Sequence, residues 1–153
     1  MNNIPQLALF LMVTLPCLGA AVVLAMSRQG IAQVRRVALT NVLITFALSI
    51  VVVASYNPAA VDETGRPQLI QMQTHLPWLG TIDAEGLFVG PGPDIQFALG
   101  VDGLSLWLVA LSALLMIPAV LVSWEAVQDR PAAFYALLLL LETGLIGVFA
   151  AQD

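Results

Sequence analysis

One acidic residue lies inside an otherwise apolar stretch of this sequence. Residues 132–151 read AAFYALLLLLETGLIGVFAA, and Glu142 is the only charge-capable residue among them. The neighbours one helical turn away, such as Leu138 and Ile146, are apolar. An isolated carboxylate is very unfavourable in an apolar medium, so Glu142 is expected to be protonated unless it has a partner or reaches water. Two roles stay open for it: a proton-relay or water-channel residue, or a protonated side chain that hydrogen-bonds two helices.

Partners for Glu142 can come only from other apolar stretches, none of which contains a basic residue. The polar candidates there are Thr40, Asn41, Thr45, Ser49 and Ser112.

Ligands for a cofactor are scarce in this chain. Cys17 is the only cysteine, and His75 is the only histidine. One thiol cannot form an internal disulfide, a zinc site or an iron–sulfur site. The sequence therefore predicts neither a metal site nor a cofactor in this chain, and His75 is interpreted as an ordinary loop residue.

The composition identifies the solvent of the chain as a lipid bilayer. Of its 153 residues, 59% are hydrophobic and 10% are charged, and the mean hydropathy is +0.92. Soluble domains carry about 25% charged residues. The net charge of −5 and the absence of a basic cluster argue against a nucleic-acid partner.

Four apolar stretches are long enough to span a bilayer, which takes about 20 helical residues. They cover residues 4–26, 37–55, 103–123 and 132–151. The predicted fold class is therefore an all-α polytopic membrane protein with four transmembrane helices.

The distribution of arginines predicts the orientation of these helices. The short loop 27–36 contains Arg28, Arg35 and Arg36, whereas the long loop 56–101 has one arginine among five acidic residues. By the positive-inside rule, the short loop is cytoplasmic and the long loop lies outside. This places the N-terminus outside.

The long outer loop contains apolar segments that predict β-structure. Residues 68–78 alternate apolar and polar side chains, and residues 86–99 hold two apolar pieces around a Gly-Pro-Gly-Pro turn. These patterns predict a strand and a hairpin that caps the helices. The chain then divides into helices at 1–55, an outer loop at 56–101, and helices at 102–153.

Two aspartates precede predicted helices and are interpreted as structural caps. Asp102 stands before Gly103, where its carboxylate can accept hydrogen bonds from the first amides of the third helix. Asp129 with Pro131 is predicted to do the same for the fourth helix.

The second half of the chain resembles a known family. The segments at 95–124 and 134–153 are similar to the N-terminal part of chain M (mitochondrial subunit 4 type) of proton-translocating NADH–quinone oxidoreductase, respiratory complex I. The specific pieces are Val101-Asp102-Gly103-Leu104-Ser105-Leu106, Ser123-Trp124, and Gly147-Val148-Phe149 leading to Asp153. The resemblance extends from Leu76 to Asp153, whereas the first two helices agree only in number and orientation.

This resemblance implies a proton-channel subunit of the membrane arm, without flavin, iron–sulfur cluster or nucleotide. Its implied partners are the other membrane-arm subunits and the lipid bilayer. The family's key glutamate and channel lysines lie beyond Asp153, so no catalytic residue can be assigned here. Glu142 and Asp153 remain candidates for a proton path or for buried polar roles. The chain is expected to be a fragment, inactive alone, of a protein in a bacterial plasma membrane.

Two alternatives stay open. One is a subunit of a related cation/proton antiporter or membrane-bound hydrogenase complex, which shares this helix pattern. The other is a small four-helix membrane protein with a structural or assembly role.

Overall fold

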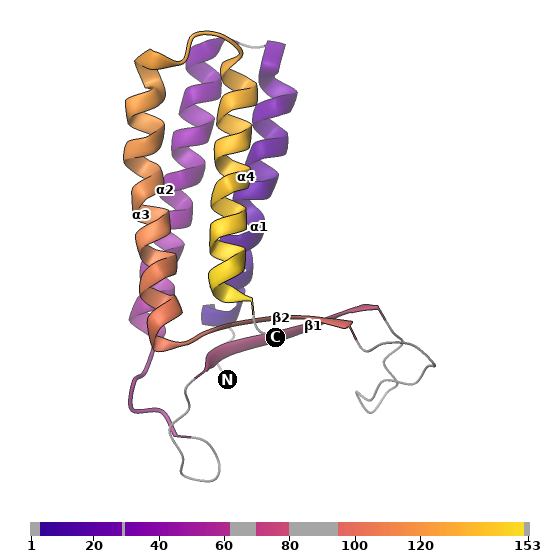
Figure 1. Ribbon diagram of the computed structural model, residues 1–153, viewed down its shortest axis with the longest axis vertical. Helices are drawn as coiled ribbons and strands as arrows, with labels where there is room; N and C mark the ends of the chain where they lie inside the picture. The colour runs from indigo at the N-terminus through magenta and orange to yellow at the C-terminus, as the bar shows by residue number, and fades with distance from the viewer. Residues whose placement is uncertain (1–3, 29, 62–69, 80–94, 152–153) are drawn as a thin grey trace.

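The computed structural model describes residues 4–28, 30–61, 70–79 and 95–151. Within these residues the chain forms four long α-helices and a two-stranded sheet (Figure 1). The elements, in chain order, are α1 Ile4–Ala25, a 3₁₀ turn Met26–Arg28, α2 Ile31–Ser55, β1 Gln71–Leu79, β2 Ile95–Val101, α3 Gly103–Ala126 and α4 Pro131–Ala150.

The helices form an antiparallel bundle in which each helix packs against its two neighbours in the chain order α1, α2, α3, α4 and back to α1. α2 also contacts α4 across the bundle. The connections α1–α2 and α3–α4 lie at one end, called here the loop end, and the sheet lies at the other, called the hairpin end (Figure 1). All four helices are long and apolar enough to cross a bilayer, as predicted.

Each helix buries one stripe of side chains and leaves large apolar residues on the outside. On the outer surface Leu104, Val122 and Val148 are 71%, 78% and 74% exposed. A helix that is apolar all round suits lipid on its outer face and protein on its inner face. The inward stripe of α2 recurs every three or four residues: Val34, Ala38, Val42, Thr45, Ser49 and Val52.

The connection between α1 and α2 is shorter than predicted. α2 begins at Ile31, so Arg35 and Arg36 are helical and do not belong to a loop at 27–36. The prediction began this helix at Val37, where the apolar stretch begins. Arginine and glutamine are good helix formers, so the helix continues beyond the apolar stretch.

The two strands form an antiparallel pair across the hairpin end (Figure 1). Gln71 pairs with Val101 and Leu76 pairs with Phe97. The strand predicted within 68–78 is present, and its partner is β2. The predicted Gly-Pro-Gly-Pro turn lies outside the described residues. Asn57 N–H donates to Gln71 Oε1 at 3.1 Å, which ties the end of α2 to the start of β1.

A polar contact fixes the α1–α2 interface. Asn41 Nδ2 donates to the Leu15 carbonyl at 3.2 Å. The Asn41 side chain lies against the backbone of Gly19, where an added Cβ would come within 2.6 Å of Asn41 Cγ. Glycine at position 19 therefore makes the space that the Asn41 amide occupies.

Candidate functional site

Glu142 projects from α4 into the centre of the bundle. Its side chain is fully buried, with 0% exposure, on the same helix face as Leu139 and Ile146. The four helices of this chain already exclude solvent and lipid from the carboxyl. Its environment is therefore set by α1–α4 themselves.

Two apolar clusters fill the bundle, one at each end, and Glu142 belongs to neither. The hairpin-side cluster includes Leu9, Met12, Val13, Val52, Leu99, Val109, Ile146 and Ala150. The loop-side cluster includes Ala20, Val23, Ala38, Val42, Val120, Tyr135 and Leu139. Because α4 enters one cluster at Leu139 and the other at Ile146, Glu142 marks the boundary between them.

The same boundary on α2 is occupied by hydroxyl side chains. Thr45 and Ser49 lie between Val42 of the loop-side cluster and Val52 of the hairpin-side cluster, and they are 0% and 1% exposed. We call Thr45, Ser49 and Glu142 the mid-bundle polar layer. Each of its three members lies on an inward-facing stripe; Glu142 and Thr45 are at the boundary between the clusters, and Ser49 is one turn beyond it, since Phe46 and Leu48 already pack against the hairpin-side cluster.

The hydroxyl groups of this layer bond to their own helix. Thr45 Oγ1–H donates to the Asn41 carbonyl at 3.1 Å, and Ser49 Oγ–H donates to the Phe46 carbonyl at 2.7 Å. Such back-bonding satisfies a buried hydroxyl locally. It leaves neither hydrogen for Glu142.

Neither carboxyl oxygen of Glu142 has a hydrogen-bond partner among the residues that the structure describes. An ionised carboxylate at this site would need several donors, because burying an unpaired charge is far more unfavourable than burying a neutral polar group. The described surroundings therefore favour the neutral acid, which has one O–H donor and acceptor capacity on its other oxygen.

The other acidic residues singled out from the sequence are dispersed. Asp102 caps α3: its Oδ1 accepts from the amides of Leu104 at 3.1 Å and Ser105 at 2.5 Å. Hydrogen bonds from the backbone amide and then the side chain of Ser105, with a smaller contribution from the Leu104 amide, lower the pKa of the Asp102 carboxyl below its usual value. Asp153 lies outside the described residues.

The prediction that Asp129 caps α4 is wrong. The residue that precedes the helix is Arg130, in the left-handed conformation with φ 50° and ψ 51°, and no side chain caps this end. Pro131 occupies the start of α4, as the sequence indicated. A proline has no amide hydrogen to satisfy there, so the end needs a capping side chain less.

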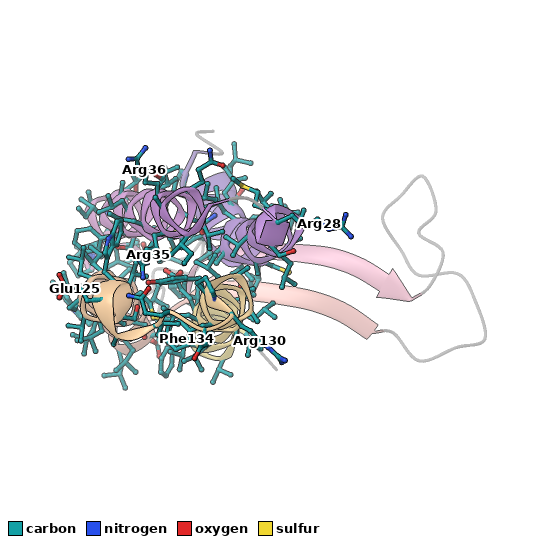
Figure 2. The ribbon with its side chains drawn as sticks, turned by 90° about the horizontal axis from the view of Figure 1, so that it is seen from above. Arg28, Arg35, Arg36, Glu125, Arg130 and Phe134 are labelled. Atoms are coloured by element: carbon teal, nitrogen blue, oxygen red, sulfur yellow. The ribbon has the colours of Figure 1, made fainter. Side chains whose placement is uncertain are left out.

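Arginines gather at the loop end, and one of them is structural (Figure 2). Figure 2 shows Arg28, Arg36 and Arg130 pointing away from the bundle, whereas Arg35 reaches toward α3. Arg35 Nη2 donates to the Val127 carbonyl at 3.0 Å, and its guanidinium lies 5.9 Å from the centre of the Trp124 ring. Sequence reasoning counted Arg35 only as a charge and missed that it joins α2 to the end of α3.

The described residues hold no group of three or more His, Cys, Asp or Glu side chains that could bind a metal ion.

Comparison with known proteins identifies relatives along nearly the whole chain. It is 30% identical to NADH-quinone oxidoreductase subunit M of Escherichia coli (strain K12) over 142 residues, which are 93% of this chain and 26% of that protein. It is 32% identical to NAD(P)H-quinone oxidoreductase chain 4 of Synechococcus sp. (strain CC9605), over 99% of this chain and 25% of that protein. No protein-family model matches the chain.

A third relative is chain 4 2 of the NAD(P)H-quinone oxidoreductase of Thermosynechococcus vestitus, 34% identical over 78% of this chain. The chain thus spans about a quarter of the length of the first two relatives, and the similarity includes the two N-terminal helices that the sequence motifs alone left undecided. With its four membrane-spanning helices, the chain is a membrane protein homologous, over nearly its whole length, to the NADH-quinone oxidoreductase subunit M and chain 4 family.

Proposed function

We propose that this chain is the N-terminal part of a proton-translocating membrane-arm subunit of NADH-quinone oxidoreductase. The observation that carries the proposal is its similarity to subunit M and chain 4 proteins over nearly its whole length, at a quarter of theirs. The electron-transfer chemistry would take place in other subunits. This chain would supply helices and hold no flavin, iron–sulfur cluster or metal.

In this role the hairpin end faces the outside of a bacterial plasma membrane, and the loop end faces the cytoplasm. The supporting observation is the position of the arginines. Arg28, Arg36 and Arg130 are exposed at the loop end, where the positive-inside rule favours the cytoplasm. The partners of the chain would be the rest of its own subunit, the other membrane-arm subunits and lipid.

The inward face of the bundle bears the groups that could take part in proton movement. Glu142 is a proton-path residue or a buried hydrogen-bonding residue, and Asp153 is a further candidate for either role. The isolated 153-residue chain is expected to move no protons, because no basic side chain faces the interior of its described transmembrane segments away from the loop end.

Inverted membrane vesicles from the source organism can test this function. Disruption of the gene should abolish the part of NADH-driven proton uptake that depends on this complex, while succinate-driven uptake continues. Unchanged NADH-driven uptake, with loss of hydrogen-dependent activity or of cation/proton exchange, would assign the chain to a hydrogenase or antiporter complex instead. If all of these activities survive, the chain has a structural role and the proposal fails.

A further inference from the structure

A cavity of about 350 Å³ lies at the loop end, between the ends of three helices. Its walls are formed by Leu24 of α1 and Ser27 of the 3₁₀ turn, by Ile31 and Val34 at the start of α2, and by residues 130–133 at the start of α4. Ligand pockets in proteins measure about 300–1,000 Å³, so this space is large enough for a small molecule or for one part of a larger one.

The wall of this cavity is largely apolar, and it lies where the helices leave the membrane. The lining residues stand at or next to the ends of three of the membrane-spanning helices. Two apolar side chains of the wall, Leu24 and Ile31, are 49% and 37% exposed. Leu137 follows the lining residue Ala133 by one turn on the same face of α4 and is 67% exposed. On this face the apolar surface therefore continues from the cavity into the hydrocarbon.

Two arginines lie beside the cavity. Arg130 is part of its wall, and Arg28 follows the lining residue Ser27 in the 3₁₀ turn, which contacts α4. Figure 2 shows both side chains leaving the bundle on the side of α1 and α4, away from Arg36 and Glu125. Among the residues that the structure describes, neither guanidinium has a hydrogen-bond or ion-pair partner. Both groups are therefore available to a ligand.

The backbone holds Arg130 at the cavity. Its φ of 50° belongs to the left-handed region, which is uncommon for a residue other than glycine. Its carbonyl accepts the amides of Ala133 at 3.1 Å and Phe134 at 3.2 Å, so Arg130 is fixed to the first turn of α4. Asp129, the nearest acidic residue in the sequence, is exposed and is not part of the cavity wall. The described charge that lines the cavity is therefore positive.

We propose that this cavity binds the head group of an anionic phospholipid. The lipid phosphate is held by Arg130 and Arg28, because a guanidinium offers paired N–H donors to phosphate oxygens, and the Ser27 hydroxyl is a further donor. A soluble anion would match the arginines alone, whereas the exposed apolar wall at the same level, which includes Leu24, matches an amphiphile whose acyl chains continue along Leu137. Basic cavities between helix ends recognise anionic lipid head groups in this way. The site requires only that the helices cross a bilayer, whichever complex the chain belongs to.

Lipid photo-crosslinking to the complete protein in its native assembly tests this site. The assembly is reconstituted in phosphatidylcholine nanodiscs with a trace of phosphatidylglycerol or phosphatidylcholine that carries a photoreactive group near its glycerol, and the crosslinked peptides are identified by mass spectrometry. Phosphatidylglycerol should label the peptides of residues 24–34 and 130–137 several-fold more than phosphatidylcholine. Arg130→Gln should lower this labelling about fivefold, the effect of one charge near an anionic lipid. Arg36→Gln is the matched control: it removes the same charge from another side of the loop end, so the labelling should not change.

Equal labelling by the two lipids, an equal loss in Arg130→Gln and Arg36→Gln, or no labelling of these peptides in the wild type would overturn the proposal. Displacement of the label by excess inorganic phosphate would identify an anion site and would also overturn it. A second variant covers the case in which Arg130→Gln fails to assemble. Ala133→Phe fills the cavity and leaves both arginines in place, so labelling by phosphatidylglycerol should fall; undiminished labelling refutes the cavity as the binding site.

Discussion

Replacing Gly19 by alanine should destabilise the bundle by separating Asn41 from α1. An added Cβ would lie 2.6 Å from Asn41 Cγ and 3.1 Å from its Oδ1, so the amide must rotate away from the helix. The hydrogen bond to the Leu15 carbonyl is then lost, which costs about 0.6–1.7 kcal/mol in a membrane protein. Strain from overpacking adds about 1–3 kcal/mol. The better helix propensity of alanine offsets about 1 kcal/mol, which leaves a net loss of about 2 kcal/mol.

The assay is unfolding of the 153-residue chain in bicelles by titration with SDS, followed by circular dichroism. The matched control is Gly144→Ala, because an added Cβ at Gly144 meets no described atom within 4 Å. That control should be neutral or slightly stabilising. Gly19→Ala should also become neutral in an Asn41→Ala background, where the clash is absent. If Gly19→Ala and Gly144→Ala unfold at the same SDS fraction, the close packing of Asn41 on Gly19 is refuted.

Four further results are expected. In a background without the native cysteine, single cysteines at Ser27 and Ala59 should react with impermeant reagents from opposite sides of the membrane; reaction of both from one side would contradict the topology. Asp102→Ala should cost about 1 kcal/mol in the SDS titration. Because the folded-state pKa of Asp102 is lowered, its stabilisation is complete at neutral pH and declines as the pH falls through that pKa, and a flat pH profile would contradict the cap. Arg35→Leu should cost about 1–2 kcal/mol in the same titration by removing a hydrogen bond and an aromatic contact, whereas an unchanged midpoint would mean that Arg35 only carries charge. Glu142→Gln in the complete complex should assemble and keep proton pumping, and Glu142→Lys should impair assembly on native gels; a pumping loss of more than about tenfold in Glu142→Gln would make Glu142 a relay.

The number and approximate positions of the helices follow from the sequence, because about 20 consecutive apolar residues have few alternatives to a membrane span. The ends of the helices do not. The prediction placed Arg35 in a loop because hydropathy reports where hydrocarbon ends. The helix instead begins at Ile31, because its backbone hydrogen bonds extend beyond the apolar stretch into the membrane–water interface.

The site was predictable only in part. A lone glutamate in an apolar stretch indicates a buried acid, and Glu142 is fully buried. Its surroundings depend on tertiary register, which a single sequence does not specify. The signal available was the spacing of Asn41, Thr45 and Ser49 at every fourth position, which indicates one polar face on α2. Nothing local could have shown that Gly19 makes room for Asn41, because that contact joins two helices.

The identity of the complex in which this chain works is tested most directly by purification. The complete gene product, tagged in its source organism, should be isolated in mild detergent, its co-purifying subunits identified, and its NADH:quinone oxidoreductase activity measured. We expect it to co-purify with the other membrane-arm subunits and with NADH-oxidising activity that reduces quinone. Co-purification with hydrogenase or antiporter subunits, or isolation of the chain alone without such activity, would contradict the proposed function.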